Sequence, residues 1–68
     1  MMTFYVNDFS EYFGYLDMAT EDGEIEFSAD VDGAYNDDLE EWDEDRIREL
    51  AEKQVRDTFG SSAKIVWG

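Results

Sequence analysis

Apolar and polar residues alternate along residues 12–31, and the alternation is broken once, by Asp22 and Gly23. An Asp-Gly pair between two alternating segments is a strong β-hairpin signal, because both residues tolerate the positive φ of a type I′ turn. We therefore predict a hairpin with Asp22 and Gly23 at its tip. Its apolar face would hold the pairs Thr20 with Ile25, Met18 with Phe27, Leu16 with Ala29 and Gly14 with Val31.

The opposite face of the predicted hairpin is polar and charged. A slip of one residue would move its carboxylates into the core, so the alternation and the turn favour a single register. That register places Ala19 near Glu26, Asp17 near Ser28 and Tyr15 near Asp30, with Glu24 beside the turn and Phe13 at the far end.

The segment before the hairpin predicts one more strand. Residues 2–7 alternate, with Phe4 and Val6 on one side and Tyr5 on the other. Residues 8–11 are polar enough to form the turn that follows, although Phe9 among them leaves a short helical turn as an alternative. The three predicted strands would form an antiparallel meander.

Residues 33–42 predict a loop and then a short helical turn. The alternation ends at residues 33–36. Asp37 is the expected N-cap, and Glu40 three residues later completes a capping box. Leu39 and Trp42 would anchor this first turn.

The main helix is expected to begin at residues 43–45, with Glu44 and Asp45 at the positive end of its dipole. Gly60 would end the helix in a left-handed conformation, and residues 63–67 form a short strand that returns to the sheet edge. The apolar residues fall on one stripe at helical spacing, which comprises Ile47, Leu50, Ala51, Val55 and Phe59.

These elements predict one α+β domain over residues 1–68, an antiparallel β-sheet in the order β-β-β-α-β with one amphipathic helix packed on one face. The other face of the sheet would stay uncovered. The predicted core comprises Phe4, Val6, Leu16, Met18, Ile25, Phe27, Val31, Ile47, Leu50, Val55, Phe59 and Ile65.

Composition limits the cellular setting and the chemistry. The 68 residues include no Cys and no His, which excludes disulfides, thiolate metal sites and the commonest catalytic bases. No apolar run is long enough to span a bilayer and no basic signal region is present, so we expect a cytoplasmic protein without membrane association. A hydrophobic content of 43% is too high for a disordered acidic tail.

The net charge of −14 is distributed very unevenly. Residues 1–45 carry 16 acidic and no basic side chains, whereas residues 46–68 carry three acidic and five basic ones. Solubility alone needs a net charge of only about 2 to 8 in magnitude for a small domain. Because such segregation costs stability through self-repulsion, we interpret it as serving a function.

The acidic residues predict a binding surface for a basic partner. Same-face residues along a strand stand about 6.6 Å apart, so the carboxylates of two paired strands and of the stretch that follows form a dense negative band. Exposed aromatic rings, with Phe13 and Tyr35 nearby, would supply the desolvated anchors of an interface. The predicted partner-binding residues are Tyr5, Tyr15, Asp17, Glu24, Glu26, Asp30, Asp37, Asp38, Glu40, Glu41, Asp43, Glu44 and Asp45.

The chain shows no pattern typical of catalysis or of a bound metal or cofactor. Aligned as a calcium loop on Gly33, it places Asp30 and Asp32 at ligand positions, but Leu39 stands where a bidentate Glu is required. Without His or Cys, and with one helix on one sheet, a general acid/base pair in a cleft is not expected. We predict a binding protein that is not an enzyme and needs no cofactor.

Three functions fit a strongly acidic surface. Duplex DNA carries one charge per about 1.7 Å of axis, so the Lys and Arg rows of a DNA-binding protein could bind this band in place of DNA. An immunity protein, antitoxin or small docking protein would bind a basic partner without copying DNA. A halophilic protein would carry the same charge only as a solvated surface.

In size, charge and α+β layout the chain resembles the small acidic inhibitors of phages and mobile elements, which include anti-CRISPR and anti-restriction proteins that mimic DNA. The resemblance implies binding to a nucleic-acid-handling defence protein, such as a CRISPR-Cas complex or a restriction nuclease, and exclusion of its target DNA. It implies no direct nucleic acid binding by this chain, which would be a monomer or a weak dimer.

Overall fold

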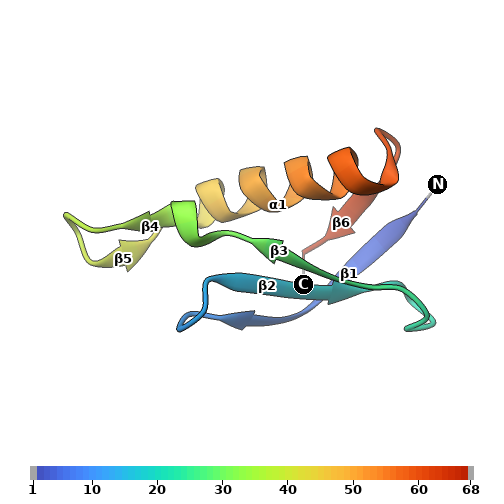
Figure 1. Cartoon of the computed structure of the whole chain (residues 1–68), viewed down its shortest axis with the longest axis horizontal. Helices are drawn as coiled ribbons and strands as arrows, with labels where there is room; N and C mark the ends of the chain where they lie inside the picture. Colours follow the sequence, from blue (N-terminus) through green and yellow to red (C-terminus); the bar gives the residue numbers. More distant parts are fainter. Residues whose placement is uncertain (1, 68) are drawn as a thin grey trace.

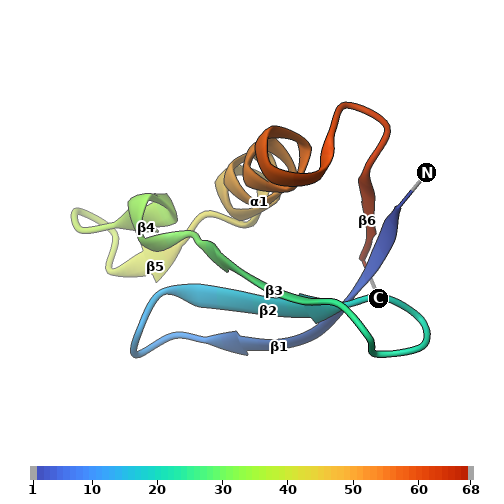
Figure 2. The same ribbon diagram turned by 45° about the vertical axis from the view of Figure 1, so that its right-hand side comes forward.

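The computed structural model describes residues 2–67 and confirms the α+β class. A four-stranded sheet in the order β3-β2-β1-β6 carries one helix on one face, and a two-stranded hairpin projects from one end (Figures 1 and 2). The elements are β1 (Thr3–Ser10), β2 (Tyr15–Ala19), β3 (Glu26–Asp30), the 3-10 helix η1 (Asp32–Ala34), β4 (Tyr35–Asn36), β5 (Glu41–Trp42), α1 (Glu44–Phe59) and β6 (Lys64–Val66).

The register of the β2–β3 hairpin is the predicted one, with Met18 opposite Phe27 and Leu16 opposite Ala29. Its turn, however, is not type I′. Gly23 has a φ of 75°, but Asp22 is not among the residues with positive φ. The Gly23 N–H donates to the Thr20 carbonyl (2.9 Å), so the chain turns one residue earlier than predicted and Gly23 follows the turn.

Hydrogen bonds to the Asp22 side chain stabilise this turn, in which Asp22 itself does not have a positive φ. The Thr20 hydroxyl and the Glu24 N–H both donate to Oδ1 of Asp22, at 2.7 and 3.1 Å. These two hydrogen bonds, the Thr20 bond foremost, lower the pKa of the fully exposed Asp22 carboxyl below its ordinary range. Asp22 therefore stabilises the turn through its side chain and not through its backbone conformation.

Strand β1 is longer than predicted because it contains a β-bulge. Val6 pairs with Met18 and Asp8 pairs with Asp17, so Asn7 is the extra residue on β1. The bulge reverses which side chains point inward, as bulges re-aim the residues that follow them. Phe9, expected in a turn, pairs with Leu16 and packs against the core.

Two segments after β3 differ from the prediction. Asp37 caps no helix; instead β4 and β5 pair as a short hairpin whose tip is the stretch 37–40. Oδ1 of Asn36 accepts hydrogen bonds from the N–H groups of Asp38 and Leu39, which folds the stretch into a turn, and Glu40 has a φ of 52°. The last strand, β6, pairs with β1 in parallel, so the sheet is mixed.

Helix α1 begins and ends where the sequence predicts. Asp43 is the N-cap, and its side chain accepts hydrogen bonds from the N–H groups of Asp45 and Arg46. Gly60 follows the last turn with a φ of 110°, and its ψ of 161° is extended instead of left-handed helical. The apolar stripe of α1 faces the sheet, with Ile47, Ala51 and Val55 buried.

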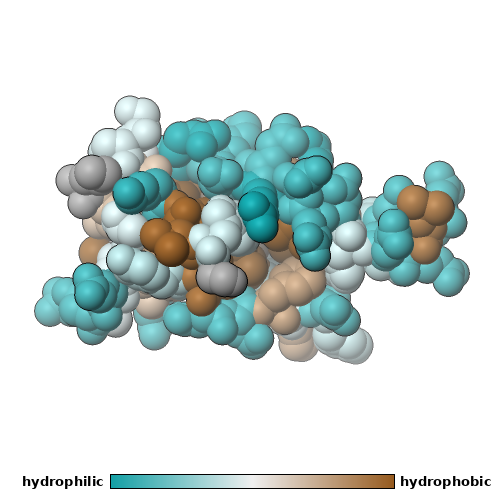
Figure 3. All heavy atoms as spheres, turned by 180° about the vertical axis from the view of Figure 1, so that it is seen from behind, coloured by the Kyte–Doolittle hydropathy of each residue, from teal (hydrophilic) through white to brown (hydrophobic). Residues whose placement is uncertain are grey.

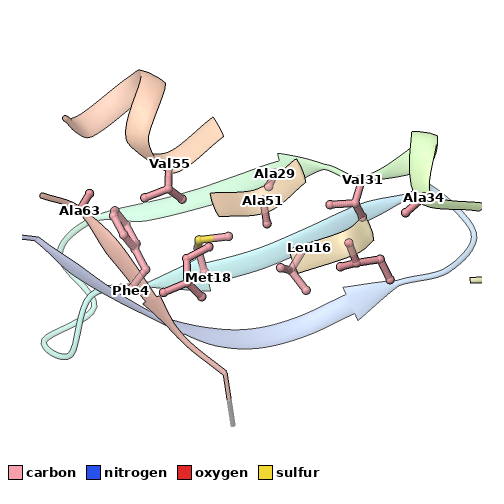
Figure 4. Packing of buried hydrophobic residues seen from close by; sticks show 11 residues of the cluster. Phe4, Leu16, Met18, Ala29, Val31, Ala34, Ala51, Val55 and Ala63 are labelled. Carbon is pink, nitrogen blue, oxygen red and sulfur yellow. The ribbon is translucent and has the colours of Figure 1, made fainter. Parts of the chain in front are cut away.

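The core lies between α1 and the inner face of the sheet (Figure 4). Three small side chains, Ala29, Ala51 and Ala63, are buried and let α1 pack closely on the sheet. None of the three is in the predicted core. Ile25 is the error in the predicted core, since 36% of its surface is exposed. The fully buried larger side chains are Phe4, Met18, Val31 and Val55.

Gly14 holds the β1–β2 turn against the loop after β3. Its φ is +72°, and a Cβ added to it would lie 3.0 Å from Cβ of Asp32. Gly23 has nearly the same φ, +75°, with nothing within 4 Å of an added Cβ. Comparing substitutions at the two glycines therefore separates the cost of backbone strain from the cost of steric crowding.

We expect Gly23→Ala to lower the free energy of unfolding by about 1–2 kcal/mol, the strain of a left-handed residue with a Cβ. Gly14→Ala should lower it by about 1 kcal/mol more, because its Cβ also collides with Asp32. Urea unfolding of the two variants measures both values. Equal losses would show that the contact between Gly14 and Asp32 is not tight.

The pKa of Asp22 predicts a pH dependence of the turn. Because the folded pKa is lowered, the contribution of Asp22 is fully present above about pH 4 and is lost as the pH falls through the folded pKa. NMR titration of the Asp22 carboxyl should give a midpoint below that of a free Asp, and Thr20→Val should raise it. An unchanged midpoint in Thr20→Val would contradict the assigned hydrogen bond.

Candidate binding surface

The sheet face turned away from α1 is here called the outer face. Three aligned rows of residues from β1, β2 and β3 make up its centre. The rows are Tyr5, Ala19 and Glu26; Asp8, Asp17 and Ser28; and Ser10, Tyr15 and Asp30.

The outer face brings several predicted binding residues together. Asp17, Glu26 and Asp30 lie on it as expected. Tyr5 and Tyr15 lie in its first and third rows, with 39% and 45% of their surfaces exposed. No basic residue stands in the three rows. Neighbouring strands lie about 4.8 Å apart, so these carboxylates and phenol rings form one continuous surface.

Asp8 joins this surface and was not predicted to be part of it. The bulge at Asn7 places Asp8 directly opposite Asp17, two like charges on adjacent strands. The Ser28 hydroxyl donates to Oδ1 of Asp17 at 2.6 Å, which partly offsets the repulsion. The alternation does break there, with polar Asp8 and apolar Phe9 in reversed phase, but a turn after the strand breaks it in the same way.

The remaining predicted residues lie elsewhere. Glu24 is in the β2–β3 turn, at the end of the molecule opposite the projecting hairpin (Figure 1). Asp37, Asp38, Glu40 and Glu41 are exposed on the β4–β5 hairpin. The predicted band is therefore two acidic surfaces, the outer face and this hairpin, with Glu24 apart from both.

The acidic residues at the start of α1 stabilise the helix itself. Asp43 uses Oδ1 to cap the helix, while Glu44 and Asp45 lie in its first turn, where negative charge stabilises the helix dipole. Their place in a binding surface stays a prediction.

The projecting hairpin also exposes an apolar residue. Leu39, expected to anchor a helical turn, is 65% exposed at its tip. Seen from behind, hydrophobic atoms lie at the end of this projection with hydrophilic atoms around them (Figure 3). The hairpin thus combines one exposed apolar side chain with four carboxylates.

Most of the basic side chains lie on the helix side, but two approach the acidic surfaces. Lys64 flanks the buried Ile65 and so lies on the outer side of β6, and Arg46 borders the same surface hollow as Asp37 and Asp38. Four of the five are on α1, which covers the inner face, and Lys64 is on β6. Arg46 pairs with Glu49 at 3.2 Å, and Lys53 pairs with Asp57 at 2.8 Å. The uneven charge of the sequence is therefore also uneven in space.

Metal binding and membrane spanning have no support in the described residues. Within residues 2–67, no three His, Cys, Asp or Glu side chains are grouped so that they could hold a metal ion. Helix α1, the one α-helix of the same residues, is too short and too polar to cross a bilayer.

Comparison with known proteins found no matching family model, no matching curated protein and no matching solved structure.

We expect Asp8→Asn to stabilise the fold by about 0.5 kcal/mol at low salt, because it removes the like-charge pair with Asp17. Salt screens such repulsion, so the gain should disappear at about 1 M NaCl. Urea unfolding at both salt concentrations measures the effect.

Glu26→Gln is the matched control for Asp8→Asn, because Glu26 lies on the same face opposite Ala19 and has no carboxylate across from it. Its effect should be smaller. A gain from Glu26→Gln as large as that from Asp8→Asn would mean that net charge, and not the pair, sets the cost.

Proposed function

We propose that this chain is a phage- or mobile-element-encoded inhibitor that binds a nucleic-acid-handling defence protein and excludes its DNA. The partner is a CRISPR-Cas complex or a restriction nuclease in the host cytoplasm. The observation that carries the proposal is the concentration of carboxylates on the outer face and the β4–β5 hairpin, while four of the five basic residues are on α1.

The dimensions of the chain support the proposal. The molecule extends 38 Å along its longest axis and about 20 Å across it. One helical turn of duplex DNA is about 34–36 Å long, so the chain could occupy a channel that grips one turn. Carboxylates spaced about 5–7 Å apart on the outer face offer Lys and Arg side chains partners at short intervals.

The energetics of the outer face also favour a basic partner. Asp8 and Asp17 repel each other in the free protein, and no cation of the chain lies in their row. A partner that places Lys or Arg beside them removes this repulsion on binding. Such charge complementarity accelerates association and favours basic partners over acidic ones.

The exposed aromatic residues add what carboxylates lack. Tyr5 and Tyr15 flank the acidic rows of the outer face. Tyrosine supplies apolar area and a hydroxyl group at low entropic cost, which is why it recurs at the centres of interfaces. These two rings would give the surface a specificity that a bare polyanion does not have.

We expect neutralisation of the outer face to weaken binding to the partner about tenfold or more. The variant combines Asp8→Asn, Asp17→Asn and Glu26→Gln, all at exposed or half-buried positions. Biolayer interferometry against a panel of purified CRISPR effector complexes and restriction nucleases measures the affinities. A panel in which no member binds the wild-type chain would contradict the proposal.

The control for this experiment combines Glu49→Gln, Glu52→Gln and Asp57→Asn on α1, which changes the net charge by the same amount. It should leave the affinity within about twofold of wild type. Equal losses in the two variants would show that net charge, and not the outer face, determines binding.

A further inference from the structure

The β1–β2 turn and the β4–β5 hairpin lie at the same end of the molecule (Figure 2). Residues of both line a shallow hollow. Three aromatic rings and two carboxylates line it. They belong to Glu11, Tyr12, Asp32, Tyr35 and Trp42. Tyr35 was expected only near the predicted interface, and the other four were not predicted to take part in binding.

Two of the three rings are held in place by the fold. Tyr35 and Trp42 are opposite each other on β4 and β5, with ring centroids 5.2 Å apart at 63°. Trp42 also packs edge-on against Phe9, at 5.0 Å and 87°. Packing therefore fixes the positions of the Tyr35 and Trp42 rings that line the hollow.

The third ring is open to solvent. Tyr12 is 90% exposed and contacts Phe13 edge-on at 4.8 Å. An exposed ring beside a built aromatic pair gives a ligand a second face to contact. The carboxylates of Glu11 and Asp32, both exposed, stand at the same hollow.

Aromatic faces and carboxylates together select a cation. The face of an aromatic ring attracts a positive charge, with Trp the strongest, and a carboxylate adds hydrogen bonds to it. A guanidinium group satisfies both, because it is planar, stacks on rings and presents several N–H donors.

We propose that this hollow binds an arginine side chain of the basic partner. The identity of that partner rests on the proposed function, whereas the affinity of the hollow for a guanidinium group does not. The hollow lies between the β1–β2 turn and the hairpin, so one bound arginine would hold the partner beside the acidic β4–β5 hairpin.

The other tryptophan of the chain shows the same contact made internally. The guanidinium carbon of Arg48 lies 5.4 Å from the ring centroid of Trp67. It is the one cation–π contact within residues 2–67, so Trp42 has no such cation in the part of the chain described. Trp67 therefore serves as an internal reference for Trp42.

The test is an NMR titration with N-acetyl-arginine amide, which carries one positive charge. We expect saturable shifts of the Trp42 indole N–H and the Tyr35 ring, with little change at Trp67. N-acetyl-citrulline amide, which has nearly the same shape without the charge, should bind at least about threefold more weakly, the effect of one exposed cation–π contact. Equal binding of the two compounds would overturn the proposal.

Substitutions locate the site. Tyr12→Ala and Glu11→Gln each should weaken binding of the arginine compound about threefold, and both positions are exposed, so the fold should survive. Phe13→Ala is the matched control, because Phe13 is 67% exposed and is not among the residues that line the hollow. Losses that do not differ between Tyr12→Ala and Phe13→Ala would overturn the site.

A second compound tests the choice of arginine. N-acetyl-lysine amide should bind more weakly than the arginine compound, and equal binding would overturn that choice. Shifts spread over all carboxylates without saturation would show counterion attraction alone and would contradict a site. The titration needs no partner protein, so its failure is distinct from failure of the proposed function.

Discussion

The structure depends on the packing of one helix against one face of one sheet. Val55 and Ala51 of α1 meet Phe4 and Met18 of the sheet, and these four side chains are almost completely buried. Residues 2–67 form no second α-helix that could cover the outer face. That face must meet solvent or a partner, and its composition determines which partner it attracts.

The same packing sets where the cations lie. The basic residues of α1 are on the helix side, where Arg46 and Lys53 pair with acidic residues of their own helix and Arg48 stacks on Trp67. The fold thus leaves the like-charge pair of Asp8 and Asp17 without an internal counter-charge. The exposed ion pairs of α1, such as Arg46 with Glu49, contribute little to stability.

The alternating pattern was enough to predict the β2–β3 register, and the apolar stripe, the acidic first turn and Gly60 were enough to predict α1. The bulge at Asn7 could not be distinguished from a turn, because both break the alternation after Val6, and only the pairing with β2 shows the reversal that carries Phe9 inward. The sequence pattern therefore missed Asp8 on the outer face.

The β4–β5 hairpin was missed for a different reason. Asp37 and Glu40 have the spacing of a capping box, but Asn36 uses its side chain to close a turn, and Trp42 packs on Phe9 from another strand. Local spacing carries no information about that distant contact. The hollow beside Trp42 was invisible in the sequence because it joins segments about thirty residues apart.

Competition with DNA tests the central claim most directly. The wild-type chain is bound to an interacting CRISPR effector or nuclease, and duplex DNA bearing the target site is titrated in at fixed salt. The account predicts that DNA and the chain exclude each other, so that the apparent affinity of the chain falls in proportion to bound DNA. A ternary complex in which DNA leaves the affinity unchanged would contradict mimicry and would indicate an immunity or docking protein.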